Sequence, residues 1–374
     1  MKSLYFDYNA TTPVHELVVR AMLPYFTEKF GNPGSVHPLG LEARNALDQA
    51  RSQLAGLINC SPEQIIFTSC ATESNNMVLR QVLKPGRELI ISAVEHPAVA
   101  QPSAELAEAG ILVQTVPVDR QGFIQPEKIM DLVSPRTGLI SVMLANNETG
   151  AVQPVKSLKR LIKPGNILIH TDAAQAVGKI PVDVQELGVD FLTIAGHKMY
   201  APKGIGALFV RDPSAIKPMF SGGGQEKGIR PGTENIPYAV ALGRAALLAD
   251  DIDREAPRQQ ELGKKLLEGL NRINRHYVLH SQSGPRLPNT MSIGFWGYQA
   301  GDILSAMIAL NISASAGAAC HGTVREMSSV LKAMQVNPKY GLGTIRFSWG
   351  RMTTLEDIHE LLNRLEYIFQ KYLA

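Results

Sequence analysis

The sequence predicts an α/β protein, with a mostly parallel sheet in a large domain and a smaller α+β domain beside it. Two observations predict this class. Short apolar runs with strand character alternate with helix-like stretches through most of the chain, and this alternation changes to polar helical patterns near the C-terminal third. The chain has 374 residues, enough for two domains, which we place at 15–250 and at 1–14 plus 251–374.

The elements of the large domain follow from periodicity. Residues 15–30 and 39–58 are expected to be helical, the second because its small and apolar residues recur on one stripe. The expected strands are 65–68, 89–92, 112–116, 139–144, 167–171, 191–195 and 207–210. Helices are expected between some of them, at 98–109 and 155–162. Such sheets are covered on both faces and bind ligands at the carboxyl ends of their strands.

The smaller domain has a different pattern. We expect a polar helix at 251–271, strands at 290–295 and 344–348, and a helix that closes the chain. Thr354 followed by Asp357 three positions later is a cap signal for that last helix.

Composition and charge limit the classes of function. Hydrophobic residues make up 45% and charged residues 19%, and the formal net charge is +3 without a block of five like charges, so neither nucleic acid nor a membrane is expected as the main partner. Residues 1–7 lack the apolar core of a signal peptide, and no apolar run is long enough to span a membrane. The cysteines, Cys60, Cys70 and Cys320, form no CxxC pair, which argues against disulfides and structural zinc and favours a cytoplasmic location.

A lysine and an aspartate follow two of the expected strands. Asp172 follows the run at 167–171, and Lys198 follows the run at 191–195 in the string Gly196-His197-Lys198. If the two strands are neighbours, both side chains can face one pocket. Chemistry with pyridoxal phosphate needs this pair, because the amine holds the aldehyde of the cofactor as an imine and the carboxylate keeps the pyridine nitrogen protonated.

Two segments are candidates for binding the phosphate of such a cofactor. The strand at 65–68 leads into 69–76, where hydroxyls and backbone N–H groups at a strand-to-helix turn can bind an anion. The glycines at 222–224 let the backbone approach closely, and Arg230 and Thr233 behind them can hold an anion. His96 follows another strand and offers a ring that can stack on a flat cofactor.

These and other motifs resemble those of the cysteine desulfurase family, a group of class-V aminotransferase-like enzymes that includes selenocysteine lyases. The resemblance covers nearly the whole chain in order. It is carried by Asp7–Thr12, Gly31–His37, Ala71–Asn76, Asn146–Gly150, Gly196–Lys198, Arg230–Asn235, Cys320 and Ile345–Ser348. It implies the aspartate-aminotransferase-like fold of pyridoxal-phosphate (PLP) transferases, a homodimer, and pyridoxal 5′-phosphate as cofactor.

The resemblance also implies a role for individual residues. Lys198 would be the Schiff-base lysine, Cys320 the sulfur acceptor, and His96 the ring that stacks on the cofactor. Arg346 would bind the substrate carboxylate, with Asn32 close by. The cofactor would be bound by Ala71, Thr72, His96, Asn147, Asp172 at the pyridine nitrogen, Gln175 at the phenolic oxygen, His197, Lys198, and Thr233 from the second subunit.

Two departures from the family pattern lie beside the cofactor. Many relatives have serine where this chain has Ala195, which removes one hydrogen bond to the phosphate, worth on the order of 1 kcal/mol. Many have glycine where Cys70 stands.

Small residues before Cys320 favour an adaptable, mobile loop, and His321 and Arg325 favour the thiolate form of Cys320.

The expected activity is that of a PLP-dependent cysteine desulfurase. L-cysteine becomes L-alanine, and its sulfur is transferred to Cys320 as a persulfide for delivery to an acceptor protein. The first alternative is a selenocysteine lyase acting on L-selenocysteine, which the string at 317–321 resembles somewhat more. An aminotransferase would leave Cys320 without a role, and a non-catalytic sulfur-carrier scaffold would not need Lys198, Asp172 and Arg346. The acceptor, for iron–sulfur clusters, for thiolation of tRNA or DNA, or for selenium metabolism, cannot be named from the sequence.

Overall fold

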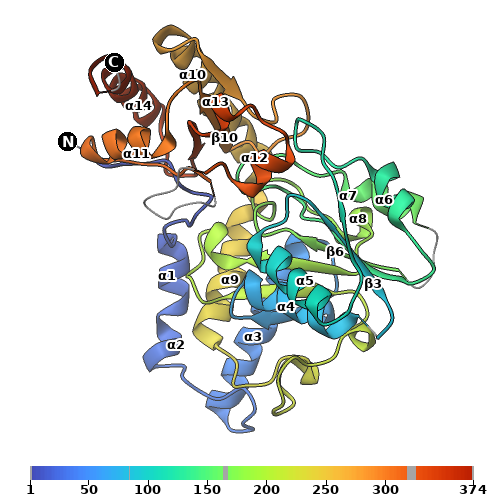
Figure 1. Cartoon of the computed structure of the whole chain (residues 1–374). Coiled ribbons are helices and arrows are strands. Elements are labelled where there is room, and N and C mark those ends of the chain that lie inside the picture. Colours follow the sequence, from blue (N-terminus) through green and yellow to red (C-terminus); the bar gives the residue numbers. More distant parts are fainter. Residues whose placement is uncertain (1, 84, 163–166, 318–325, 373–374) are drawn as a thin grey trace.

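Residues 2–83, 85–162, 167–317 and 326–372 are described by the computed structural model of the chain (Figure 1). The strands are β1 (Leu4–Tyr5), β2 (Ile65–Thr68), β3 (Glu88–Ser92), β4 (Val113–Val116), β5 (Thr137–Ser141), β6 (Leu168–Asp172), β7 (Phe191–Ala195), β8 (Gly206–Val210), β9 (Tyr277–Leu279), β10 (Thr290–Phe295), β11 (Ile312–Ser313) and β12 (Thr344–Ser348). The α-helices are α1 (Glu16–Met22), α2 (Pro24–Thr27), α3 (Pro38–Leu57), α4 (Ala71–Val82), α5 (Pro97–Glu108), α6 (Pro126–Leu132), α7 (Val155–Leu161), α8 (Val184–Leu187), α9 (Ile236–Leu248), α10 (Ile252–Ile273), α11 (Ala300–Ala309), α12 (Ser329–Ala333), α13 (Pro338–Gly341) and α14 (Leu355–Tyr367).

The largest sheet among the described residues has seven strands in the order β2-β8-β7-β6-β5-β3-β4. The strands from β4 to β7 run parallel, and β8 is antiparallel to its neighbours β7 and β2. The prediction of a mostly parallel sheet is therefore confirmed. The carboxyl ends of β5, β6 and β7 lie at one edge, which is where an open α/β sheet binds its ligand.

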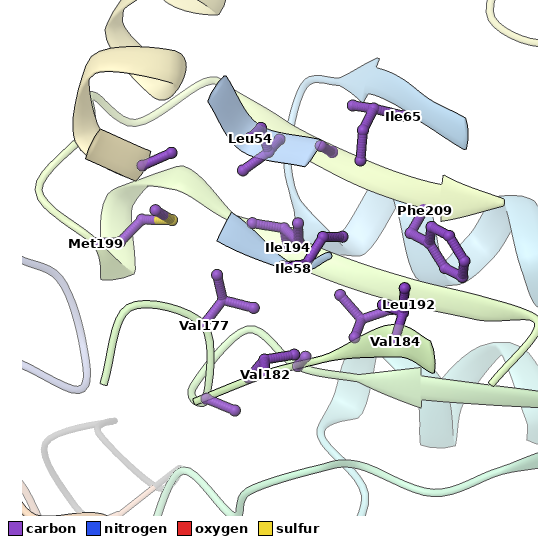
Figure 2. Packing of buried hydrophobic residues seen from close by; sticks show 14 of the residues in the cluster. Leu54, Ile58, Ile65, Val177, Val182, Val184, Leu192, Ile194, Met199 and Phe209 are labelled. Atoms are coloured by element: carbon purple, nitrogen blue, oxygen red, sulfur yellow. The ribbon is translucent and has the colours of Figure 1, made fainter. Parts of the chain in front are cut away.

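Helices cover both faces of this sheet because its strands are apolar on both sides. On β2, Ile65 and Phe67 belong to one hydrophobic cluster, whereas Ile66 between them belongs to a second cluster. The first cluster includes Leu54 of α3, seen beside Ile65 in Figure 2, and the second includes Val78 of α4. Alternation with a period of two, with both sets buried, is what a covered parallel sheet requires.

A third cluster joins the start of the chain to its C-terminal part. Leu4 of β1 and Phe6 pack with the fully buried Trp349 and with apolar side chains of α10, β10, α11, β12 and α14. β1 pairs with β11 in parallel, and β10 lies between β9 and β12 in an antiparallel sheet. Figure 1 shows both chain ends on this part of the molecule.

Most expected elements are present, with shifts at their ends. The strands at 65–68, 191–195, 290–295 and 344–348 have the predicted bounds. The predicted helix at 15–30 is instead two short helices, because Pro24 has no N–H with which to continue α1. The predicted cap of α14 is a reciprocal capping box between Thr354 and Asp357. None of the helices in the described part of the chain is long and apolar enough to cross a membrane.

Candidate active site

Asp172 and Lys198 stand at the ends of adjacent parallel strands. Asp172 is the last residue of β6, and its register partner on β7 is Thr193. β7 ends at Ala195, and a single short helical turn, Gly196–Lys198, follows it. The expectation that the two strands are neighbours is confirmed, and both residues leave the same edge of the sheet.

Lys198 reaches the N-terminal segment of the chain. Its Nζ donates to the carbonyl oxygens of Asn9, at 2.5 Å, and Ala10, at 2.7 Å. Burial and the nearby positive charge of Arg346 lower the pKa of Lys198 to about 8, although Asp7 and Asp172 oppose this. An amine with this pKa is partly uncharged near neutral pH, and only the uncharged amine is a nucleophile.

Asp172 is buried, and hydrogen bonds hold both of its carboxylate oxygens. Oδ2 accepts from Nδ2 of Asn75, on α4, at 2.7 Å, and Oδ1 accepts from the backbone N–H of Ala174 at 2.9 Å. The two hydrogen bonds therefore hold the Asp172 carboxylate in one orientation.

Arg346 lies on β12 and approaches the site from the smaller sheet. Only 4% of its surface is exposed. Its Nη2 donates to Asp7 Oδ1 at 2.6 Å and its Nη1 donates to the Asn147 carbonyl at 3.0 Å, whereas Nε has no partner among the described residues. The guanidinium is thus held in place and retains hydrogen-bonding capacity for an acidic ligand.

Gln175 and Asn147 are linked through Asn9. Gln175 Nε2 donates to the Asn9 carbonyl at 2.9 Å. Asn9 Nδ2 donates to the Asn147 carbonyl at 3.2 Å and to Thr290 Oγ1 at 2.8 Å. Since Lys198 also donates to the Asn9 carbonyl, Asn9 connects residues that follow β5, β6 and β7 with Thr290 of β10.

The expected phosphate turn lies between β2 and α4. Cys70 precedes α4 in an extended conformation, and its side chain makes no cap hydrogen bond to the helix. Glu73 closes the turn by accepting from the Ser69 N–H at 2.7 Å and from Arg230 Nε at 2.8 Å. Arg230 therefore pairs with a carboxylate of the turn, whereas the sequence suggested that it would hold the anion itself.

His197 lies in a positively charged environment. Its Nδ1 is 3.2 Å from Thr11 Oγ1. Desolvation, together with the positive charges of Lys198, Lys203 and Lys179, lowers the pKa of His197 to about 4. Three lysines and a helix N-terminus without a side-chain cap make this region suitable for an anion.

His96 is the N-cap of α5. Its Nδ1 accepts from the Ala98 N–H at 3.1 Å, so the ring is held in one orientation. Desolvation lowers the pKa of His96, Lys198 acts in the same direction, and Asp172 opposes them. A neutral ring near Asp172 and Lys198 suits stacking on a flat cofactor.

The remaining expected residues are placed differently. Asn32 is exposed, and its Oδ1 accepts from the Gly34 N–H within its own turn. Thr233 is exposed beside the start of α9. Residues 318–325, which include Cys320, His321 and Arg325, lie outside the described residues, so the expected mobility of the loop with Cys320 stays a prediction. Cys60 is partly buried, and burial raises its pKa to about 12, in keeping with an unreactive thiol.

Four residues of the site have no role in the prediction from sequence: Asp7, Asn9, Asn75 and Lys179. Asp7, Asn9 and Asn75 lie in motifs that carry the family resemblance, but the motifs do not indicate their contacts. Asn75 faces Asp172 from a different element, a contact that sequence spacing does not encode. Lys179 contacts Gln175 across a series of turns that the sequence pattern does not predict.

Comparisons with known proteins agree with this geometry. The family described as aminotransferase class-V matches residues 4–361. The cysteine desulfurase IscS of Dictyoglomus turgidum is 40% identical over 375 residues, which cover 99% of this chain and 95% of the relative. The chain belongs to the cysteine desulfurase family. The cysteine desulfurase NifS of Azotobacter vinelandii is 39% identical over 370 residues, 98% of this chain and 92% of that relative.

Two solved structures have the same fold. A NifS-like protein superposes with a TM-score of 0.92 at 35% identity and covers 99% of this chain and 100% of its own. SspA in complex with cysteine superposes with a TM-score of 0.83 at 32% identity, over 94% of this chain and 100% of its own. The fold is the α/β fold of PLP-dependent transferases, and the cofactor is pyridoxal 5′-phosphate.

Proposed function

We propose that the protein is a cysteine desulfurase that converts L-cysteine to L-alanine and transfers the sulfur to Cys320 as a persulfide. One observation carries this proposal: the segment Asp7–Ala10 is contacted by Lys198 at Asn9 and Ala10 and by Arg346 at Asp7. An amine of lowered pKa and a buried guanidinium are thereby held close together. This is the pair needed to act on the α-carbon of an amino acid while its carboxylate is bound.

The described residues fit pyridoxal 5′-phosphate. The carboxylate of Asp172 would pair with the ring nitrogen, and His96 would stack on the ring. The other residues proposed to bind it are Ala71, Thr72, Asn147, Gln175, His197 and, from a second subunit, Thr233. When bound, the cofactor supplies an electron sink for the substrate's α-carbon.

Lys198 would bind the cofactor and then handle the substrate's α-proton. With a pKa of about 8, its Nζ can take up a proton and release it again near neutral pH. Its two backbone acceptors, the carbonyls of Asn9 and Ala10, keep Nζ at a fixed place when it is charged.

Arg346 would bind the substrate carboxylate. Its Nε and Nη2 form one edge of the guanidinium, the geometry that matches two carboxylate oxygens, and Asp7 already pairs with Nη2. We propose Asn32 as a second group near the carboxylate.

Cys320 would act as a thiolate. Its sulfur attacks the substrate sulfur, a sulfur–sulfur bond forms, and the carbon–sulfur bond of the substrate breaks with its electron pair left on carbon. A proton then completes alanine, so one thiol of the protein and L-cysteine give a persulfide and L-alanine. We propose that an acceptor protein removes this sulfur.

The test is alanine formation by the purified protein from L-cysteine and from L-selenocysteine. Cysteine is expected to be used, and Cys320→Ser is expected to abolish this reaction and the persulfide, whereas Cys60→Ser leaves both. Use of selenocysteine alone would favour the lyase alternative. A persulfide on Cys60 or Cys70, with Cys320 unmodified, would overturn the role of Cys320.

We further propose a homodimer in which Thr233 completes the neighbour's phosphate site. Apolar side chains on and around α1 and α2 are at least a third exposed: Leu17, Val19, Leu23, Phe26 and Phe30. Such a patch is characteristic of a surface covered by another chain. A monomer that retains full activity at nanomolar concentration would contradict this proposal.

We propose the domain division at 15–250 and at 1–14 plus 251–374, because Leu4 and Phe6 belong to one hydrophobic cluster with residues of the C-terminal part. A smaller cluster, of Val94 and Met143 with Val330, Leu331 and Met334, packs the two units against each other. We propose a cytoplasmic location, because the chain's thiols and its sulfur chemistry require reducing surroundings.

A further inference from the structure

Asn75 is a fully buried asparagine of α4, and the proposed function does not use it. Its Nδ2 donates to Oδ2 of Asp172 at 2.7 Å, and within the described residues no other group donates to this oxygen. The second carboxylate oxygen, Oδ1, accepts from the backbone N–H of Ala174 at 2.9 Å. Asn75 is therefore one of the two groups that hold the side chain of Asp172.

The amide of Asn75 has one partner where it could have several. Its Oδ1 is buried and accepts no hydrogen bond from the described residues. Turning the amide over would place this oxygen against the oxygens of Asp172, so the nitrogen end faces the carboxylate. Burying an oxygen without a partner costs free energy, and an apolar side chain would avoid that cost. The contact with Asp172 therefore explains why this buried position is polar.

Packing of α4 fixes the position of Asn75. Val78, one turn further along the helix, lies in the hydrophobic cluster that includes Phe191 of β7. Oγ of Ser74, the residue before Asn75, is 2.8 Å from Oγ1 of Thr68 at the end of β2. The helix begins at the turn proposed to bind the phosphate of the cofactor. One rigid helix thus connects the proposed phosphate turn with the support of Asp172.

We propose that Asn75 is a positioning residue that keeps the Asp172 carboxylate turned towards the ring nitrogen of pyridoxal 5′-phosphate. This inference rests on the proposed function, in which Asp172 pairs with that nitrogen. The backbone of Asp172 is already fixed by the sheet, where its carbonyl accepts from the Leu144 N–H at 2.8 Å. Rotation of the carboxylate remains, and Asn75 and Ala174 restrict it. Asn75 itself needs no contact with the substrate or the cofactor.

Loss of the Asn75 amide would act at one end of the cofactor. Without the Nδ2 donor, the carboxylate of Asp172 can turn about its last bond, and binding of the ring nitrogen must order it again. The side chain of Asn75 makes no other hydrogen bond within the described residues, so the groups proposed at the phosphate and at the aldehyde keep their contacts. The effect of removing Asn75 should therefore depend on the ring nitrogen.

The test compares two ligands of the cofactor-free protein. One is pyridoxal 5′-phosphate, and the other is its 1-deaza analogue, in which a C–H group replaces the ring nitrogen and cannot pair with Asp172. Asn75→Leu is expected to lower the affinity for pyridoxal 5′-phosphate roughly three- to tenfold, the effect of ordering one side chain on binding. The affinity for the analogue is expected not to fall.

Asn76→Leu is the matched control. Asn76 is the next residue of α4, and its amide contacts the Thr72 carbonyl and Arg80 instead of Asp172. This variant is expected to keep the wild-type ratio of the two affinities. Should Asn75→Leu fail to fold, as seen by thermal unfolding, Asn75→Met takes its place, because the flexible methionine side chain adapts to the space around it.

The outcomes separate this inference from the proposed function. A wild-type protein that does not bind the cofactor at Lys198 refutes the proposed function, and one that binds both ligands equally tightly refutes the proposed role of Asp172. A wild-type protein that binds at Lys198 and prefers pyridoxal 5′-phosphate, together with an Asn75→Leu variant of unchanged affinity ratio, refutes only the role of Asn75. Equal losses for both ligands belong to this last outcome, because they would show that Asn75 only supports the fold.

Discussion

Replacing Arg346 with lysine tests how the substrate carboxylate is bound. Lysine keeps the positive charge that lowers the pKa of Lys198, so binding of the cofactor and its absorbance are expected to remain. Lysine cannot keep the binding geometry of the guanidinium. One ammonium cannot replace the contacts of Arg346 to Asp7 and Asn147 and also offer the substrate carboxylate two parallel N–H donors.

The expected loss is at least one hydrogen bond between charged groups. Such a bond contributes about 1.5–3 kcal/mol, which corresponds to a roughly 10- to 150-fold fall in kcat/KM for L-cysteine. The assay is alanine formation over a range of cysteine concentrations, with the absorbance of the bound cofactor recorded on the same samples.

Arg364→Lys is the matched control. Arg364 is 6% exposed, against 4% for Arg346, and also donates to backbone carbonyls, those of Lys2 and Leu310, but away from the site. Its replacement is expected to affect stability and not kcat/KM. Unchanged kcat/KM in Arg346→Lys would refute the reasoning and place the carboxylate elsewhere.

Three further predictions concern buried charges. In the cofactor-free protein, labelling of Lys198 by an amine-specific reagent is expected to rise with a midpoint near pH 8, because burial lowers its pKa to about 8 from 10.5; a midpoint near 10.5 would contradict this. Burial raises the pKa of Glu95 to about 8 from 4.5, so the cost of ionising it in the folded protein lowers stability as pH rises from about 4.5 to 8. Glu95→Gln should therefore raise the thermal unfolding temperature more at pH 8 than at pH 5. An equal rise at the two pH values would show that ionisation of Glu95 is not the cause. Arg51→Met should lower the free energy of unfolding by about 3–5 kcal/mol, because it leaves Glu226 buried without its ion pair, whereas Arg20→Met at the exposed pair with Glu16 should leave stability unchanged; equal stabilities of the two variants in denaturant would contradict this.

The positions of the strands of the large sheet along the chain were predictable because each one is a short apolar run bounded by turn residues. The covered sheet followed from the same runs, since strands such as β2 and β7 carry apolar side chains on both faces. The break between α1 and α2 was predictable from Pro24. It was missed because the apolar residues at 15–30 have the spacing of one continuous helix.

The candidate site was predictable where chemistry follows directly after a strand. Asp172 and Lys198 stand out because polar residues terminate apolar runs. The contacts that position them were not predictable in this way: Asn75 reaches Asp172 from α4, 97 residues away in sequence, and Asn9 reaches Thr290 across 281 residues. Arg230 was assigned to an anion because nothing in its local sequence indicates the ion pair with Glu73.

Reduction of the bound cofactor with borohydride, followed by peptide mapping, tests the site most directly. Lys179 and Lys198 both have lowered pKa values and lie near Asn9, so either amine is a chemical candidate for attachment. Attachment at Lys198 is predicted, because it directly follows β7 beside Asp172, whereas Lys179 is held by two amide oxygens. A reduced cofactor mapped to Lys179, or to any other lysine, would contradict the assignment of the site.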